Sequence, residues 1–476
     1  MSLKAQQEIA NWKLEARLED NARYFYRISA LPRLHSGEHS YVIGRKGSGK
    51  TALSEYLYQS RGPTKFTAKL TFKNFPFNDL YALTNNSYRQ PNQYITLWKY
   101  LIYSSVAKLM ILNEAIDSQI REQLRQVYAD DPKLSLPRTI ARWTSNDFDL
   151  KVMGSGIKRT VQSTHLPNST PWVERVELLE SIIENHLDES EYVLVFDELD
   201  EDYGAGEDGP RTEYWQLLTS LFKAVQDVRA NIQKSQFRIR PIVFLRDDIY
   251  AQIRDADKNK WEDVIFRLEW TPAVIQDLLA FRISRAANLN GPILTFEQAW
   301  GLIYQETSVK FGTSKGKSLS SFDYITRAGC WRPRDYIRYM KATAQRAVDG
   351  AISPVSSEIV FLSLKEFSNY LRGEMEDEIG GTFPDIKAIL DLIAHIRKPI
   401  FTLGEFDIAY QQSVRNGHNI KRNSEDVLRT LFRFSVIGNW TRQQKMVFHY
   451  TNREARLNLS EGFVVHPGLL RAFQIS

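Results

Sequence analysis

One glycine-rich segment constrains the fold more than any other part of the chain. It runs Gly44-Arg45-Lys46-Gly47-Ser48-Gly49-Lys50-Thr51 and matches the pattern G-x-x-x-x-G-K-S/T. A short apolar run at residues 40–43 precedes it, and a helical pattern continues from Lys50 to about Gln59. Glycines let backbone N–H groups turn towards an anion, and the dipole of the following helix favours negative charge there. The sequence therefore predicts a strand, a phosphate-binding loop and a helix.

The residues of this loop have separate predicted roles. Lys50 can reach the β- and γ-phosphates of a nucleotide, and the hydroxyl of Thr51 can be a ligand of Mg²⁺. The competing interpretation is a glycine-rich turn with a chance Lys-Thr, which the strand and helix on either side disfavour. We expect the following residues to bind nucleotide: Gly44, Gly47, Ser48, Gly49, Lys50, Thr51 and Ala52.

A pair of acidic residues follows the strongest buried-strand signal in the chain. The apolar run Tyr192–Phe196 ends in Asp197 and Glu198. A parallel strand delivers such residues to its carboxyl end, where ligands of α/β sheets bind. We expect Asp197 to hold Mg²⁺, through water or through Thr51, and Glu198 to polarise the attacking water. The alternative is a solvated acidic turn, which we favour for residues 200–202.

A cation follows a second buried strand, Pro241–Leu245. Arg246 stands at its end and could detect a γ-phosphate or offset charge in the transition state. The alternative interpretation is an arginine paired with Asp247 or Asp248. With Lys50 and Glu198, Arg246 completes the predicted catalytic set.

Short apolar strands alternate with helical patterns, which indicates an α/β fold with a parallel sheet flanked by helices. We expect an N-terminal helical segment over residues 1–35, with residues 1–30 as one helix. The core should occupy residues 36–270, with an insert at about 118–185. Residues 271–350 look helical only and would form a lid, and residues 351–476 begin with helices and end in extended runs. We expect the segment around Leu31–His39 to form the adenine pocket.

Composition narrows the function classes. Cys330 is the only cysteine, so no disulfide can form within the chain, and the eight histidines show no zinc-binding pattern. No apolar stretch is long enough to span a bilayer and the start lacks a signal-peptide core, so we expect a cytoplasmic protein without membrane contact. The net charge of +5 is uneven: residues 408–476 carry ten Lys and Arg against four Asp and Glu.

The order of these motifs resembles the additional-strand P-loop ATPases, which include AAA+ and STAND proteins. The segment Phe244-Leu245-Arg246-Asp247-Asp248-Ile249-Tyr250 is similar to the FLR-x-DIY segment of a bacterial ATPase family often found near mobile elements and defence genes. STAND ATPases carry an arginine at the position of Arg246. The resemblance covers about Ser40–Met340 and implies ATP and Mg²⁺ as ligands.

Two more features come from this resemblance. The segment Gly329-Cys330-Trp331-Arg332-Pro333-Arg334-Asp335 resembles the lid segment of origin-recognition-type ATPases, in which an arginine senses nucleotide. Either Arg332 or Arg334 could be that residue, and solvated arginines beside a helix-start proline are the alternative. The group's C-terminal domain is often a winged helix, here with helices at 384–396, 403–412 and 424–434 and a wing hairpin at Asn439–Asn452.

The C-terminal region is rich in cations that could contact DNA. They are Arg415, Lys421, Arg422, Arg429, Arg433, Arg442, Lys445, Arg453 and Arg456. Such a surface could instead be solvated, bind an effector protein, or attract the acidic core.

We therefore expect an ATP-binding and ATP-hydrolysing switch that controls homo-oligomer assembly or partner binding, in antiphage defence. The alternative is a DNA-binding ATPase that loads or regulates another protein on DNA. The Asp197-Glu198 pair argues against a small-molecule kinase.

Overall fold

We describe a computed structural model of the chain over residues 2–29, 31–73, 77–81, 94–128, 138–139, 172–203, 211–233, 237–310, 318–417, 420 and 422–475. A five-stranded parallel sheet forms its centre, in the order β2-β3-β4-β1-β5. The strands are β1 (Tyr41–Gly44), β2 (Lys65–Thr71), β3 (Glu191–Asp197), β4 (Arg238–Arg246) and β5 (Ile265–Arg267). The fold class predicted from the sequence is confirmed. Strand β4 lies between β1, which carries the glycine-rich loop, and β3, which carries the acidic pair.

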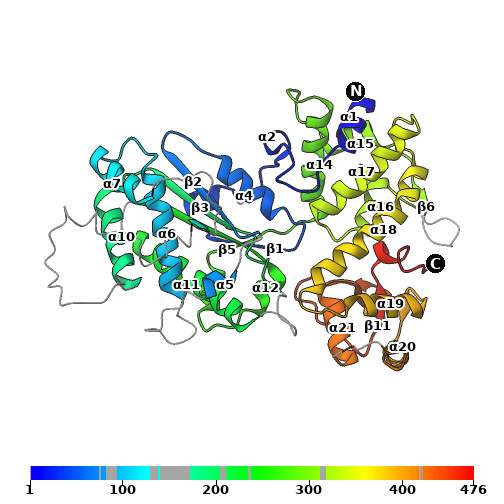
Figure 1. The fold of residues 1–476 in the computed structure, drawn as a ribbon. Coiled ribbons are helices and arrows are strands. Elements are labelled where there is room, and N and C mark those ends of the chain that lie inside the picture. Colours follow the sequence, from blue (N-terminus) through cyan, green and yellow to red (C-terminus); the bar gives the residue numbers. More distant parts are fainter. Residues whose placement is uncertain are drawn as a thin grey trace.

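Helices cover both faces of this sheet because successive side chains of each strand point to opposite faces. Val42, Val195 and Phe244 pack with Leu53 and Leu57 of α4 (Lys50–Gln59). The alternate strand residues form a larger core on the other face, with α6 (Ile95–Met110) and α11 (Thr212–Gln233). Figure 1 shows α6, α7 (Ser118–Tyr128) and α10 (Trp172–His186) gathered at one end of the sheet. The short helices α5 (Phe77–Tyr81), α12 (Asp247–Gln252) and α13 (Lys258–Glu262) complete the core.

A helical lid follows β5. It contains α14 (Pro272–Ala287), α15 (Phe296–Ile303), α16 (Ser321–Ala328) and α17 (Pro333–Asp349). The expectation of helices alone is wrong in one detail, because Val309–Lys310 (β6) and Ser318–Leu319 (β7) form a small antiparallel pair. Helix α1 (Ser2–Ala10) joins this layer, since Ala5 and Ile9 are buried in the core that α14 and α17 share. In Figure 1 the N-terminus accordingly lies beside α14 and α17.

The long helix α18 (Ser357–Gly380) leads from the lid to the C-terminal region (Figure 1). There, α19 (Ile386–Ile396), α20 (Leu403–Arg415) and α21 (Ser424–Arg433) are the three helices expected from the sequence. They pack on a four-stranded sheet of order β10-β9-β11-β8, formed by β8 (Ile400–Phe401), β9 (Ile437–Trp440), β10 (Met446–Val447) and β11 (Gly462–Val465). Strands β9 and β10 pair antiparallel, so the predicted hairpin is present, and a 3-10 turn at Pro467–Leu469 follows β11.

The expectation of one helix over residues 1–30 is wrong. After α1 the chain forms only α2 (Asn21–Tyr24) and α3 (Leu31–Ser36), and residues 11–20 are not helical. Leu18, which the helical pattern included, is 67 % exposed, so this stretch has no continuous buried face that would stabilise a helix. Most of the predicted insert (129–137 and 140–171) and Lys421 lie outside the described residues. In the part of the chain that the structure describes, no helix has the length and apolarity to cross a bilayer.

Candidate nucleotide site

The glycine-rich loop joins the end of β1 to the start of α4. Gly47 and Gly49 have φ values of 80° and 96°, a conformation that L residues with a Cβ rarely adopt. The indole Nε1 of Trp270 donates a hydrogen bond to the carbonyl of Ser48 at 2.8 Å, which ties the loop to the segment after β5. The Lys50 ammonium donates to the carbonyls of Gly44 and Arg45, at 2.9 and 3.0 Å. The strand, loop and helix thus follow one another in the arrangement that the sequence predicts for a phosphate-binding loop.

The loop borders a pocket of about 420 Å³, which also receives residues from β3, β4 and the lid. Lys46, Gly47, Gly49, Lys50, Thr51 and Ala52 line it, whereas Gly44 and Ser48 lie behind this lining. Burial lowers the pKa of Lys50 below that of a free lysine. The buried hydroxyl of Ser48 has no hydrogen-bond partner among the described residues. A nucleotide triphosphate with Mg²⁺ suits this environment, since it brings acceptors for the loop amides and for Lys50, which line the pocket.

The carboxylate of Asp197 lies at the carboxyl end of β3, as predicted. Its Oδ2 accepts a hydrogen bond from the hydroxyl of Ser54 at 2.6 Å and lies 3.1 Å from the ammonium of Lys69. Its Oδ1 accepts the backbone N–H of Glu198 at 3.0 Å. Lys69 also contacts Glu55 at 2.8 Å, and only 6 % of its side chain is exposed. These three contacts hold the carboxylate of Asp197 in one orientation, in which it can orient the water shell of a cation.

Glu198 has an unusual backbone and an unexpected partner. Its φ of 61° is in the left-handed region, which costs a non-glycine residue about 1 kcal/mol or more. Its carboxylate forms an ion pair with Arg17, from the non-helical segment after α1. Burial and, secondly, the charge of Asp197 raise the pKa of Glu198 above the ordinary glutamate value, while Arg17, Lys69 and Lys73 oppose that rise.

Arg246 ends β4 and lines the pocket, but its guanidinium is occupied. It donates to both oxygens of Asp248, at 3.0 and 2.7 Å, and to the carbonyl of Glu378 at 3.0 Å. The pairing with Asp248 that we kept as an alternative is thus present. Because Glu378 belongs to α18, Arg246 connects the sheet with the helix that follows the lid.

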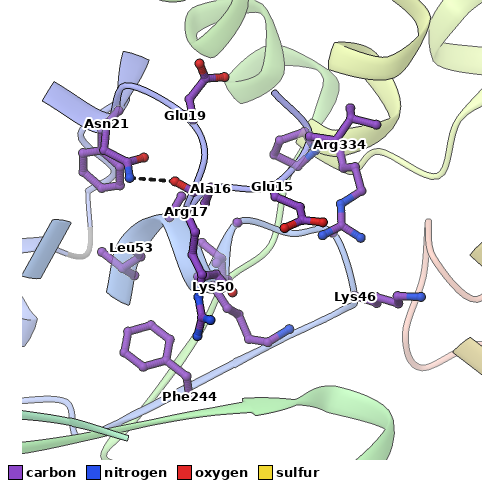
Figure 2. Close-up of a pocket in the computed structure, with 18 of the residues that line it drawn as sticks. Glu15, Ala16, Arg17, Glu19, Asn21, Lys46, Lys50, Leu53, Phe244 and Arg334 are labelled. Atoms are coloured by element: carbon purple, nitrogen blue, oxygen red, sulfur yellow. Dashed lines mark hydrogen bonds between the residues drawn. The ribbon is translucent and has the colours of Figure 1, made fainter. Parts of the chain in front are cut away.

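The two lid arginines have different environments. Arg334 lines the pocket, pairs with Glu374 at 3.2 Å and lies close to Gly47, whose added Cβ would be 3.3 Å from its Cβ (Figure 2). Arg332 is only 2 % exposed and pairs with Asp335 and Glu378, at 3.0 Å each. The geometry therefore puts Arg334 at the nucleotide site and Arg332 in a buried ion network behind it.

The expected adenine pocket around Leu31–His39 is corrected by the structure. None of those residues lines the cavity, because Leu31 and Leu34 are buried between α4 and the sheet. The cavity is lined instead by residues 13–17, 19, 21, 24–26 and 28. Figure 2 shows Glu15, Ala16 and Arg17 on one side of the pocket, and Lys50 and Phe244 nearby.

Sequence reasoning missed four residues of this site: Arg17, Ser54, Lys69 and Trp270. Residues 66–72 alternate between apolar and polar side chains, and a lysine within that strand pattern is a usable signal for Lys69. Trp270 follows the strand after Arg246, and nothing around it in the sequence indicates its hydrogen bond to the loop. Arg17 gave no signal, since it lies 181 residues from its partner Glu198.

Comparison with known proteins adds a distant relative. No family model matches the chain. The putative transposon gamma-delta 80.3 kDa protein of Escherichia coli is 22 % identical over 377 residues, and the match covers 75 % of this chain. The matched part is 49 % of that protein, so the chain spans about half the length of this curated relative.

Three solved structures resemble the fold. The ORC2 protein of Aeropyrum pernix in ADPNP and ADP complexes has 11 % identity and a TM-score of 0.36, and the match covers 94 % of this chain and 90 % of that one. Drosophila ORC bound to DNA has 12 % identity and a TM-score of 0.30, with 100 % of this chain and 91 % of that one covered. Cdc6p of Pyrobaculum aerophilum has 14 % identity and a TM-score of 0.30, with 98 % of this chain and 96 % of that one covered. Likenesses of this size transfer no property to the chain, so its function has to follow from its own site.

Proposed function

We propose that this protein is a Mg²⁺-dependent ATPase that acts as a regulatory switch. One observation carries the proposal: the glycine-rich loop with Lys50, the acidic pair after β3, Arg246 after β4 and Arg334 of the lid all border one cavity. A site that receives groups from both the sheet and the lid can couple the state of the nucleotide to the arrangement of the lid.

Each residue has a role in this proposal. The backbone of Gly47–Ala52, the N-terminus of α4 and Lys50 bind the phosphates. Thr51 and Asp197 would hold Mg²⁺, which would supply positive charge to offset negative charge on the phosphate oxygens. Glu198 orients the water for in-line attack on the γ-phosphate, and Arg246 and Arg334 offset negative charge.

The readout of the switch would be assembly of a homo-oligomer or binding of an effector. Helix α18 supports such coupling, because Glu374 and Asp377 lie 3.7 and 3.8 Å from Lys46 of the loop, and α18 leads directly to the C-terminal region. The similarity of residues 244–250 to a defence-associated ATPase segment motivates antiphage defence as the setting.

Two variants test the proposal. Lys50→Ala should remove ATP binding, because the loop loses the ammonium predicted to reach the β- and γ-phosphates, and binding of a fluorescent ATP analogue measures this. Glu198→Gln should bind ATP with Mg²⁺ but hydrolyse it at least about a hundredfold more slowly, because an amide cannot accept the proton. Unchanged ATP affinity of Lys50→Ala would show that the site is assigned wrongly. Size-exclusion chromatography of Glu198→Gln with ATP tests assembly.

A second candidate function, a DNA-regulated ATPase, is favoured by the tip of the β9–β10 hairpin. Arg442 and Lys445 are exposed there, and within the described part of the chain neither side chain has an ion-pair or hydrogen-bond partner. The name of the E. coli relative, a transposon protein, agrees with a DNA setting. Duplex DNA should then stimulate ATP hydrolysis with steep salt dependence, and Arg442→Glu with Lys445→Glu should abolish the stimulation. Equal rates with and without DNA would exclude this candidate.

A further inference from the structure

The segment between α1 and α2 crosses the nucleotide pocket. Its residues 13–17 and 19 line the cavity, and the amide of Asn21 donates to the carbonyl of Ala16 at 2.8 Å, which holds its path (Figure 2). We call residues 11–20 the N-terminal strap. The strap has no helical or strand hydrogen bonds of its own, so contacts with the rest of the molecule fix it in place.

One set of contacts fastens the strap to the lid. Glu19 pairs with Arg282 of α14 at 2.7 Å, and both side chains are less than one-tenth exposed. The Arg282 guanidinium also stacks over the rings of Trp12 and Tyr24, at 4.4 and 4.8 Å. Lys341 of α17 donates to the carbonyl of Trp12 at 3.1 Å. These contacts attach the strap to helices α14 and α17 of the lid.

An ion pair fastens the strap to the core of the site. Arg17 reaches across the pocket and pairs with Oε2 of Glu198. About a third of the Arg17 side chain is exposed, against 18 % of Glu198, so the arginine is the more exposed partner of the pair. Within the described structure, the other charged groups that act on Glu198 are Asp197, Lys69 and Lys73, and none of them comes from the lid.

We infer that Arg17 restrains hydrolysis by occupying the carboxylate of Glu198, and that movement of the lid-anchored strap releases it. This inference rests on the proposed ATPase function. A carboxylate that accepts a guanidinium has one oxygen less for the attacking water, and its orientation follows Arg17 instead of the γ-phosphate. Hydrolysis then depends on the position of the lid, which gives the switch a defined off state.

The test compares Arg17→Ala and Glu19→Gln with wild type in the full chain. Arg17→Ala frees Glu198 directly, and Glu19→Gln loosens the strap without touching Glu198. We expect Arg17→Ala to raise kcat for ATP roughly threefold to tenfold, the size of losing one partly exposed arginine–carboxylate pair, with little change in ATP affinity. Glu19→Gln should change kcat in the same direction. Arg33→Ala, which removes an exposed arginine of α3 outside the pocket, should leave kcat unchanged.

A conservative variant separates this role from a merely structural one. Arg17→Lys keeps a cation that can pair with the carboxylate of Glu198, so its kcat should stay nearer to the wild-type value than that of Arg17→Ala. In the Glu198→Gln background, Arg17→Ala should change nothing.

Two results would overturn the inference while leaving the ATPase function intact. A fall in kcat of Arg17→Ala would make Arg17 a direct ligand of the phosphates, and an unchanged kcat would make the pair incidental. If wild type neither bound nor hydrolysed ATP, the proposed function itself would fail.

Discussion

At the scale of single residues, two neighbouring arginines show how position in the fold separates roles that look equal in the sequence. Arg332 and Arg334 stand on either side of Pro333, the first residue of α17, and both occur in the lid motif. A helix directs residues two positions apart to different faces. Arg332 is consequently buried against Asp335 and Glu378, and Arg334 faces the pocket.

This difference predicts opposite phenotypes. Arg332→Met should lower the free energy of unfolding by about 3–5 kcal/mol, because it leaves two buried carboxylates without their cation. Arg334→Met should leave the free energy of unfolding within about 0.5 kcal/mol of wild type and weaken ATP binding about tenfold or more, because one charged hydrogen bond to phosphate is lost. Urea unfolding and nucleotide titration of both variants measure these effects. The reverse pattern would assign the nucleotide contact to Arg332.

At the scale of elements, regular patterns were predictable and long-range partners were not. Helix α11 is one example, because Leu218, Leu221 and Val225 recur at helical spacing and are buried in the core beside the sheet. The strands at 192–196 and 241–245 were equally clear, since both of their faces are buried. The N-terminal helix failed because Trp12 packs under Arg282 of the lid, a contact that no local spacing reveals.

The same limit applied to the site. The glycine-rich loop and the acidic pair are local motifs, and the structure brings them to one cavity. The pairing of Arg246 with Asp248 was foreseeable because the two residues are neighbours in sequence. The contacts of Glu198 with Arg17 and of Arg246 with the carbonyl of Glu378 depend on how the lid and α18 pack against the sheet.

Helix α18 contacts the phosphate loop through its acidic side chains. Glu374 accepts a hydrogen bond from Arg334 at 3.2 Å and lies 3.7 Å from Lys46, so it competes with phosphate for both cations. Glu374→Gln should raise the affinity for ATP about twofold to fivefold, since these pairs are partly exposed and worth about 0.5–1 kcal/mol. Titration with ATP and Mg²⁺ measures this. Glu376→Gln is the matched control, because Glu376 pairs with Arg372 and does not line the pocket. If Glu374→Gln alone bound ATP more weakly, Glu374 would instead position Arg334 for phosphate.

At the scale of the whole molecule, the basic C-terminal region meets the acidic end of the core. Arg453 lies 3.2 Å from Asp247 and 3.0 Å from Glu269, and Arg433 donates to the carbonyl of Asp248 at 2.8 Å. Arg422 and Arg429 are also engaged within the C-terminal region, with the carbonyl of Thr382 and with Glu425. Several cations that could contact DNA are therefore engaged within the molecule, whereas Arg442 and Lys445 at the hairpin tip have no such partner among the described residues.

These contacts make closure sensitive to charge. Arg453→Glu should repel Asp247 and Glu269, so the C-terminal region should separate from the core more often. Because the pairs are partly exposed and worth about 1 kcal/mol together, we expect amide hydrogen exchange at residues 247–252 to quicken roughly threefold to tenfold. Raising the salt concentration should quicken the exchange of wild type in the same direction and leave the variant nearly unaffected. Arg442→Glu, on the exposed hairpin tip, is the charge-matched control and should exchange like wild type. Equal exchange in all three proteins would mean that apolar packing, and not these ion pairs, keeps the C-terminal region on the core. We would then expect nucleotide to move the lid and leave the C-terminal region in place.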